Sequence, residues 1–129
     1  MSRPIADVLR SAGAAVLERG WLSANNILLR GDGPTALVDS GYANHSEQTI
    51  ALVEHELGGG RLNLLLNTHL HSDHCGGNAA LKQRFPELRT LIPPGQAAAV
   101  EAWDEDALSY RATGQFCPRF VSDGLLIPG

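Results

Sequence analysis

The chain has 129 residues, within the size range of a single domain. Its composition, 43% hydrophobic and 19% charged, excludes a disordered chain, and no apolar run reaches the roughly 18 residues of a membrane-spanning helix. The net charge of -4 argues against a surface that binds polyanions, so neither nucleic acid nor a membrane is an expected partner.

The first part of the chain predicts a helix followed by a β-hairpin. Apolar residues recur at helical spacing between Ile5 and Ala12, which favours a short amphipathic helix. Further on, two short apolar runs, 26–30 and 35–39, flank a turn-rich stretch at 31–34. Turn residues between two such runs are typical of a β-hairpin.

The middle of the chain predicts further helices and strands. Asn44 and Glu47 have the spacing of a capping box, so we expect a helix that begins there and ends at the glycines 58–60. Asn78 is a second candidate cap, for a helix that Pro86 ends. The other expected elements are strands at 62–67 and 90–92, a helix at 96–103 and a strand within 122–129. Strands that alternate with helices indicate a single α/β domain.

Three of the five histidines, His69, His71 and His74, fall within six residues, with Asp73 among them. Three imidazoles and a carboxylate in one loop cost desolvation free energy unless something gathers them, and imidazole nitrogens and carboxylate oxygens are ordinary ligands of divalent metals. The segment follows the apolar run that ends at Leu66, and open α/β sheets bind ligands at the carboxyl ends of their strands. The cluster therefore predicts a metal site, with a solvated His-rich loop as the alternative.

The motif at 69–74, His-x-His-x-Asp-His, resembles the signature of the metallo-β-lactamase-fold hydrolases, the superfamily that includes glyoxalase II and the lactonases. Upstream, Asp39 within 37–41 is similar to the family's first motif, an Asp that ends a strand before a small residue and Gly. The resemblance extends from about residue 20 to residue 129. It implies that the chain forms the N-terminal half of an αββα sandwich, a mixed sheet with outer helices.

The resemblance also implies a role for each residue of the motif. In the family, the positions of His69 and His71 bind a first metal ion together with a third His, and those of Asp73 and His74 bind a second ion where one is present. Asp39 is expected to orient a ligand or a loop beneath the site, or to act only as a turn former after its strand. The implied cofactor is one or two zinc ions, with iron or manganese as alternatives.

The activity implied is hydrolysis of a small acyl substrate, namely an ester, thioester, lactone or similar compound, by metal-bound hydroxide. Asp73 would be the catalytic residue that holds or deprotonates the attacking water. Two other functions stay open: a mononuclear iron dioxygenase that acts on sulfur substrates and has the same fold, and an inactive metal-binding remnant.

The sequence departs from the family after His74, because no further histidine follows, whereas the family has a third metal-binding His and a bridging Asp downstream. We therefore expect residues 1–129 to be a C-terminally truncated domain that carries only the first ligand set. A bare sheet face would promote association, so the expected partner is a second copy or a missing C-terminal half. Weak metal binding and little activity are expected for the chain alone.

Cys75 and Cys117 allow one disulfide at most, and free thiols in the cytoplasm are predicted because no secretory signal is evident. Cys75 is expected to fill a tight turn, with a soft metal ligand or a reactive thiol as the alternative. His45 and His55 are expected at the surface, and the acidic run 104–106 is expected to form a solvated cap or turn.

Overall fold

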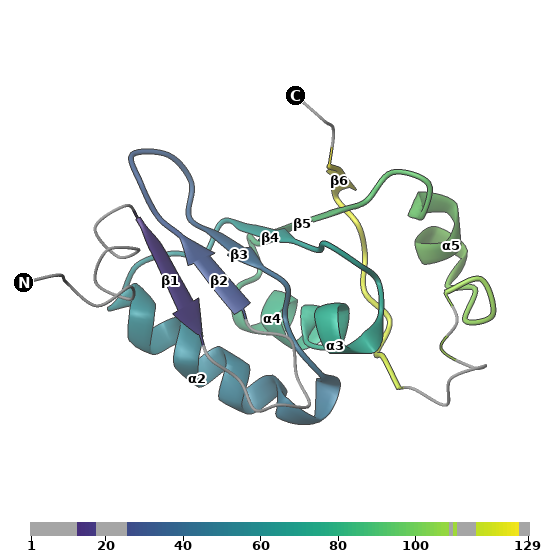
Figure 1. Ribbon diagram of the computed structural model, residues 1–129, viewed down its shortest axis with the longest axis horizontal. Helices are drawn as coiled ribbons and strands as arrows, with labels where there is room; N and C mark the ends of the chain where they lie inside the picture. Colours follow the sequence, from purple (N-terminus) through teal and green to yellow (C-terminus); the bar gives the residue numbers. More distant parts are fainter. Residues whose placement is uncertain (1–12, 18–25, 109, 111–115, 127–129) are drawn as a thin grey trace, which may run out of the picture.

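The computed structural model describes residues 13–17, 26–108, 110 and 116–126. A six-stranded mixed sheet runs through it, with the strands side by side in chain order (Figure 1). The second strand pairs antiparallel with the first and with the third, and the pairs from the third strand to the sixth are parallel. The strands are β1 (Ala14–Leu17), β2 (Asn26–Leu29), β3 (Ala36–Val38), β4 (Leu64–Leu66), β5 (Arg89–Ile92) and β6 (Gly124–Leu125).

Helices α2, α3 and α4 lie on one side of this sheet, and α5 stands beyond the end of β5 (Figure 1). The longest of them, α2, follows directly on a short 3-10 helix, η1. No helix in the part of the chain that the structure describes is long and apolar enough to cross a membrane. The bounds are η1 (Ala43–His45), α2 (Ser46–Leu57), α3 (Ser72–Cys75), α4 (Asn78–Arg84) and α5 (Ala97–Ala102).

The main core lies between the sheet and the helices. Leu28, Leu37 and Leu65 are opposite one another in the strand register and are fully buried. From α2, Val53 and Leu57 pack in the same cluster. Each buried side chain of this size stabilises the fold by about 1.5–3 kcal/mol, so this layer fixes the strands that carry the site described below.

The other face of the sheet is apolar as well. Val16, Ile27 and Leu29 alternate with the buried core residues of β1 and β2, and their side chains remain 37–39% exposed. In the register Ile27 lies opposite Val38, which extends this face to β3. Soluble monomers rarely leave a contiguous apolar surface of this kind uncovered.

The structure confirms the predicted hairpin of β2 and β3, the later strands and the end of α2 at Gly58, whose φ of 57° is left-handed. Both predicted helix caps are wrong. Asn44 lies inside η1, and α2 begins at Ser46 without a side-chain cap. Asn78 is the first residue of α4 and its side chain is buried. The expected helix between residues 5 and 12 lies outside the described residues.

Candidate metal centre

The candidate site lies where β3 and β4 end. Because these strands are parallel, their carboxyl ends meet at the same edge of the sheet. Asp39 directly follows β3, and its backbone N–H donates to the carbonyl of Leu66 at 2.8 Å. Ser40 N–H donates to the carbonyl of His74 at 2.7 Å. The turn after β3 therefore supports the His-rich loop after β4 directly.

The four predicted metal ligands come together at this edge. The ring centroids of His69 and His74 are 5.0 Å apart, those of His69 and His71 are 5.9 Å apart, and those of His71 and His74 are 6.5 Å apart. An Asp73 oxygen, Oδ2, lies 3.5 Å from His74 Nε2. The structure thus gathers these side chains, whose roles as ligands stay a prediction.

Asp39 holds His74 in place. Its Oδ2 accepts a hydrogen bond from His74 Nδ1 at 2.9 Å, and the carboxylate is 94% buried. A proton fixed on Nδ1 leaves Nε2 as the nitrogen that faces Asp73 and is available to a metal. The φ of Asp39 is 63°, a left-handed conformation that Asp tolerates better than most residues.

Thr68 completes this arrangement and was not singled out by the sequence analysis. Its backbone N–H donates to Asp39 Oδ1 at 2.8 Å and its hydroxyl donates to Oδ2 at 2.6 Å. The same Oγ1 lies 3.2 Å from His69 Nδ1, so a His69 tautomer with its proton on Nδ1 satisfies this contact and leaves Nε2 available. Its place just before the His motif was the signal that could have revealed it.

A buried amide network beneath the loop was also missed. Asn78 Nδ2 donates to Asn67 Oδ1 at 2.6 Å, and the Ser40 hydroxyl donates to Asn78 Oδ1 at 2.6 Å. Asn67 Nδ2 in turn donates to the carbonyl of His74 at 3.3 Å. The three side chains are no more than 1% exposed, so the network joins the ends of β3 and β4 to the start of α4 inside the protein.

Two glycines permit the close approach of these segments. A Cβ atom on Gly76 would lie 2.5 Å from the backbone nitrogen of Ala43, and one on Gly77 would lie 2.5 Å from the carbonyl oxygen of Ser40. Contacts this short are not tolerated, so the backbone after α3 packs directly against the backbone after β3.

The donor set fits a divalent metal in chemistry but not in number. Imidazole and carboxylate groups are suitable ligands for zinc, and a catalytic zinc is usually held by three protein ligands. Within residues 13–17, 26–108, 110 and 116–126, no three His, Cys, Asp or Glu side chains are arranged to hold one ion. The predicted assignment gives two ligands to each of two ions, His69 with His71 for one and Asp73 with His74 for the other.

A cavity of about 240 Å³ opens beside the histidines. Its polar lining comes from Thr68, His69, His71 and Gln96, and the remainder is mostly apolar. The apolar lining residues are Leu70, Pro93, Pro94, Ala107 and Leu108. This arrangement can accommodate a small molecule with both polar and apolar groups next to the imidazoles.

Behind the site, Cys75 and Cys117 form a buried cluster with Tyr110 that the sequence analysis did not predict. Cys75 Sγ lies 3.7 Å from Cys117 Sγ and 3.0 Å from the Tyr110 hydroxyl, and both cysteines are free thiols. The hydrogen bond with Cys117, together with burial, raises the pKa of Cys75 far above its usual value, and this hydrogen bond lowers the pKa of Cys117. Burial raises the pKa of Tyr110 strongly. Cys75 therefore packs within this cluster in α3, whereas a tight turn was predicted.

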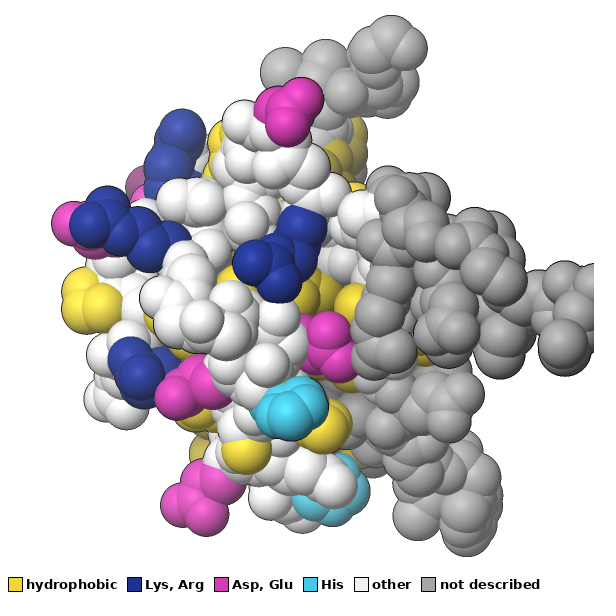
Figure 2. Space-filling model, turned by 90° about the vertical axis from the view of Figure 1, so that its left-hand side faces the viewer, with side chains coloured by type: hydrophobic (Ala, Val, Ile, Leu, Met, Phe, Trp, Pro, Cys, Tyr) yellow, Lys and Arg dark blue, Asp and Glu magenta, His cyan; other side chains and the backbone are white. Residues whose placement is uncertain are grey.

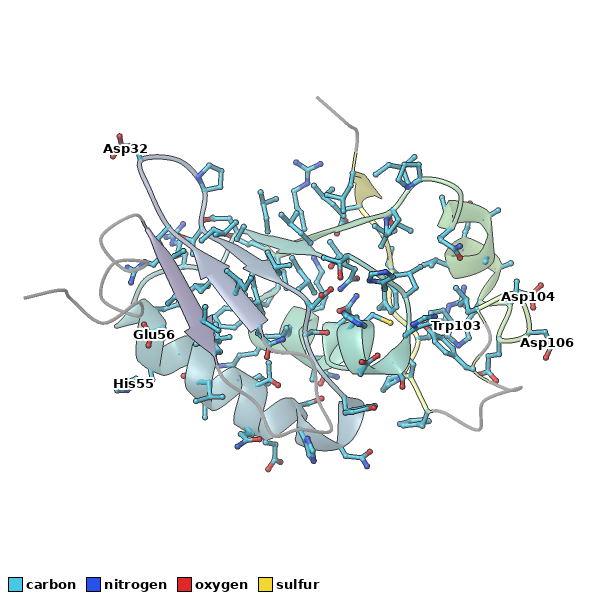
Figure 3. All side chains as sticks on the ribbon, viewed as in Figure 1. Asp32, His55, Glu56, Trp103, Asp104 and Asp106 are labelled. Carbon is cyan, nitrogen blue, oxygen red and sulfur yellow. The ribbon has the colours of Figure 1, made fainter. Side chains whose placement is uncertain are left out.

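The other candidate residues lie away from the site. His45 and His55 are exposed, as predicted, and His55 points outward from α2 in Figure 3. Asp104 Oδ1 accepts hydrogen bonds from the backbone N–H groups of Asp106 and Ala107, both at 3.1 Å. This confirms that the acidic run forms a solvated turn, which projects outward in Figure 3.

A larger cavity, of about 530 Å³, lies at the opposite end of the parallel strands, where β4 and β5 begin. Charged side chains of both signs line it: Glu54, Arg61, Arg84 and Glu87. Figure 2 shows this end of the molecule, with basic and acidic side chains interspersed. The lining of this larger cavity includes none of the predicted metal ligands.

Curated proteins with similar sequences share one name. The hydroxyacylglutathione hydrolase of Stenotrophomonas maltophilia is 39% identical over 67 residues, which are 52% of this chain and 24% of that protein. The hydroxyacylglutathione hydrolase of Xanthomonas euvesicatoria pv. vesicatoria is 36% identical over 75 residues, 58% of this chain and 28% of that protein. The chain thus matches about a quarter of the length of these relatives.

Solved structures show the same fold. The FEZ-1 metallo-beta-lactamase of Legionella gormanii has a TM-score of 0.74 at 15% identity, over 89% of this chain and 44% of that one. A beta-lactamase from Chitinophaga pinensis has a TM-score of 0.71 at 21% identity, over 92% of this chain and 44% of that one. The family model of the metallo-beta-lactamase superfamily matches residues 19–128. The chain therefore belongs to the metallo-beta-lactamase superfamily.

Proposed function

We propose that this chain supplies part of the zinc site of a hydrolase that cleaves a small acyl substrate, with a thioester as the first candidate. The observation that carries the proposal is the cluster of three histidines and Asp73 at the carboxyl end of β4, with His74 held by Asp39. The thioester is favoured because the curated relatives are named hydroxyacylglutathione hydrolases. Esters and lactones offer the same carbonyl chemistry and are tested alongside it.

In this proposal His69 and His71 contribute to one metal position, and Asp73 and His74 contribute to a second. Zinc, when bound, lowers the pKa of a coordinated water towards about 7 and polarises the substrate carbonyl. The Asp73 carboxylate holds the attacking water and accepts its proton. The hydrogen bond from His74 to Asp39 keeps the imidazole oriented, and the cavity beside His69 and His71 holds the acyl group.

We further propose that polypeptide outside this chain completes the site and covers the bare face of the sheet. The matching solved structures are more than twice as long as the region they share with this chain. Val16, Ile27 and Leu29 give this face an apolar surface that a second sheet layer would bury. The free thiols are consistent with a reducing compartment, and a cytoplasmic location is proposed on that basis.

Zinc titration of the purified chain tests the metal site. We expect weak binding, since each ion finds two protein ligands here, and we expect His71→Ala to abolish binding at the position that His69 and His71 share. His55→Ala is the matched control, because this exposed histidine on α2 lies away from the cluster (Figure 3). If His71→Ala and wild type bound zinc equally, the proposed site would be wrong.

Hydrolysis is tested by mixing the chain with the remaining part of one matching relative, the hydroxyacylglutathione hydrolase of Stenotrophomonas maltophilia. We expect zinc-dependent release of thiol from an S-acylglutathione by the mixture and little release by either part alone. Bound zinc without hydrolysis of any thioester, ester or lactone would contradict the proposed activity. One equivalent of bound iron with oxygen uptake would favour the dioxygenase instead.

A further inference from the structure

Two thiols that are distant in the sequence meet inside the protein. Cys75 and Cys117 are 42 residues apart, and their Sγ atoms are separated by 3.7 Å. A disulfide bond is about 2.05 Å long, so the two sulfurs need to approach by less than about 2 Å to form one. No other cysteine exists in the chain, so this pair has no competing intramolecular partner.

The fold holds this pair in place from both sides. Cys75 is the last residue of α3, and Cys117 belongs to the segment that leads to β6. Both pack in one core cluster with Leu70 and Phe120, and Cys117 Sγ also lies 3.7 Å from the carbonyl oxygen of Cys75. Reacting groups that a structure holds in contact behave as if highly concentrated, which favours a bond between them over reaction with outside thiols.

A metal site does not account for the pair. The third polar group of the cluster is the Tyr110 hydroxyl, 3.0 Å from Cys75 Sγ. Within the described ranges, no group of three His, Cys, Asp or Glu side chains that includes these thiols is arranged to hold an ion. Redox chemistry between the two sulfurs is the reaction that their contact favours.

We propose that Cys75 and Cys117 form a reversible disulfide when the protein meets a small-molecule disulfide. Cys117 reacts first because this residue retains 5% exposure, whereas Cys75 is fully buried. The Cys117 thiolate attacks one sulfur of the small disulfide, that S–S bond breaks, and one thiol leaves. Cys75 then attacks the Cys117 sulfur of the mixed disulfide and releases the second thiol. Two protein thiols are oxidised, and one small disulfide is reduced to two thiols.

The consequence is a covalent link between α3 and the segment that leads into the last strand. Helix α3 carries Asp73 and His74, and the segment with Cys117 continues into β6, which pairs with β5. The disulfide would close a long loop and so restrict the unfolded chain. Oxidation therefore stabilises the folded arrangement in which α3 contacts this segment, and reduction removes that stabilisation. This inference does not depend on the proposed hydrolase activity.

The experiment equilibrates the chain in buffers of reduced and oxidised glutathione, quenches it with acid, and measures the linked peptides by mass spectrometry. A fold that holds the sulfurs in contact stabilises the disulfide by the same factor as the disulfide stabilises the fold. The measured quantity is the squared concentration of reduced glutathione divided by the concentration of glutathione disulfide, at the point where half of the chain is oxidised. We expect this ratio to be at least about tenfold higher for the folded chain than for the chain in urea. Dithiothreitol should restore both thiols.

Single variants provide the controls. In Cys75→Ser we expect only a mixed disulfide of Cys117 with glutathione, and in Cys117→Ser we expect Cys75 to stay reduced because it is buried. If a variant fails to fold, the comparison of folded and urea-treated wild type still decides the result. A ratio equal to or below that in urea, or a wild type that stops at the mixed disulfide or links two chains, would overturn the proposal.

Discussion

The Asp39 carboxylate and the His74 imidazole, 35 residues apart in the chain, meet at 2.9 Å between Oδ2 and Nδ1. Asp39 follows β3, and His74 lies in α3 just beyond β4, so this hydrogen bond joins the ends of two neighbouring parallel strands. Thr68 donates to both oxygens of the same carboxylate. The orientation of the most buried candidate ligand therefore depends on a residue outside the His motif.

Replacement of this carboxylate should weaken metal binding. Asn in the Asp39→Asn variant tolerates the left-handed backbone at this position, but its amide would place a donor against the donors of Thr68 and His74. Loss of a hydrogen-bonded partner behind a metal-ligating His typically costs about 10–100-fold in affinity. We expect zinc affinity, measured by competition with a chromogenic chelator, to fall by this factor. Asp32→Asn is the control, because Asp32 lies in the exposed turn between β2 and β3 (Figure 3). This variant should bind zinc with the affinity of wild type.

The buried amide network should be important for stability. Asn78→Ala leaves the fully buried Asn67 Oδ1 without its side-chain donor and removes the shorter of the two hydrogen bonds that the buried Ser40 hydroxyl can donate. Unpaired buried polar groups cost about 1–3 kcal/mol each, so we expect the free energy of unfolding in urea to fall by about 2–3 kcal/mol. Asn44→Ala, at the exposed residue that the sequence predicted as a cap, should change it by less than about 0.5 kcal/mol. Equal losses in the two variants would contradict the structural role given to Asn78.

The bare sheet face should drive association. We expect the chain to sediment as a dimer or larger species at micromolar concentration, because the side chains around Ile27 remain exposed. Ile27→Lys places a charge in the centre of this face and should shift the population toward monomer. Val121→Lys, at a side chain that is 74% exposed and lies outside β1–β4, should leave the sedimentation profile unchanged. A wild-type chain that stays monomeric and unfolds cooperatively would show that the face needs no cover.

Tyr110 should make stability depend on alkaline pH. Burial raises the pKa of Tyr110 in the folded protein, whereas an exposed tyrosine in the unfolded chain loses its proton near pH 10. The unfolded state therefore binds fewer protons above about pH 10, and the stability that neutral Tyr110 contributes below that pH is lost as the pH rises further. We expect the urea unfolding free energy to fall more steeply between about pH 9.5 and about pH 11 in wild type than in Tyr110→Phe. Parallel curves would contradict this prediction.

Local patterns were enough to predict much of this fold. The hairpin followed from two apolar runs around a turn, and the later strands followed from short apolar segments between turn residues. The clustering of the histidines at 69–74 followed from their spacing and from the strand that precedes them. These features depend on residues close together in the chain, which is why the sequence revealed them.

Features that depend on distant contacts were missed or wrongly assigned. Asn78 has the residue type of a helix cap, but its side chain bonds to Asn67, eleven residues earlier, because the packing of α4 against the strand ends buries it. Likewise, Cys75 and Cys117 gave no local sign that their sulfurs would meet. Tertiary packing overrides local preference at such positions.

The backbone contact at Gly76 and Gly77 determines where this site can be altered. Any side chain at either position would collide with the turn that follows β3, so the inner side of the His loop offers no room for new groups. The wall formed by Pro93, Pro94 and Gln96 faces the cavity from another segment of the chain. Libraries aimed at a new substrate preference should therefore vary this wall and leave the two glycines untouched.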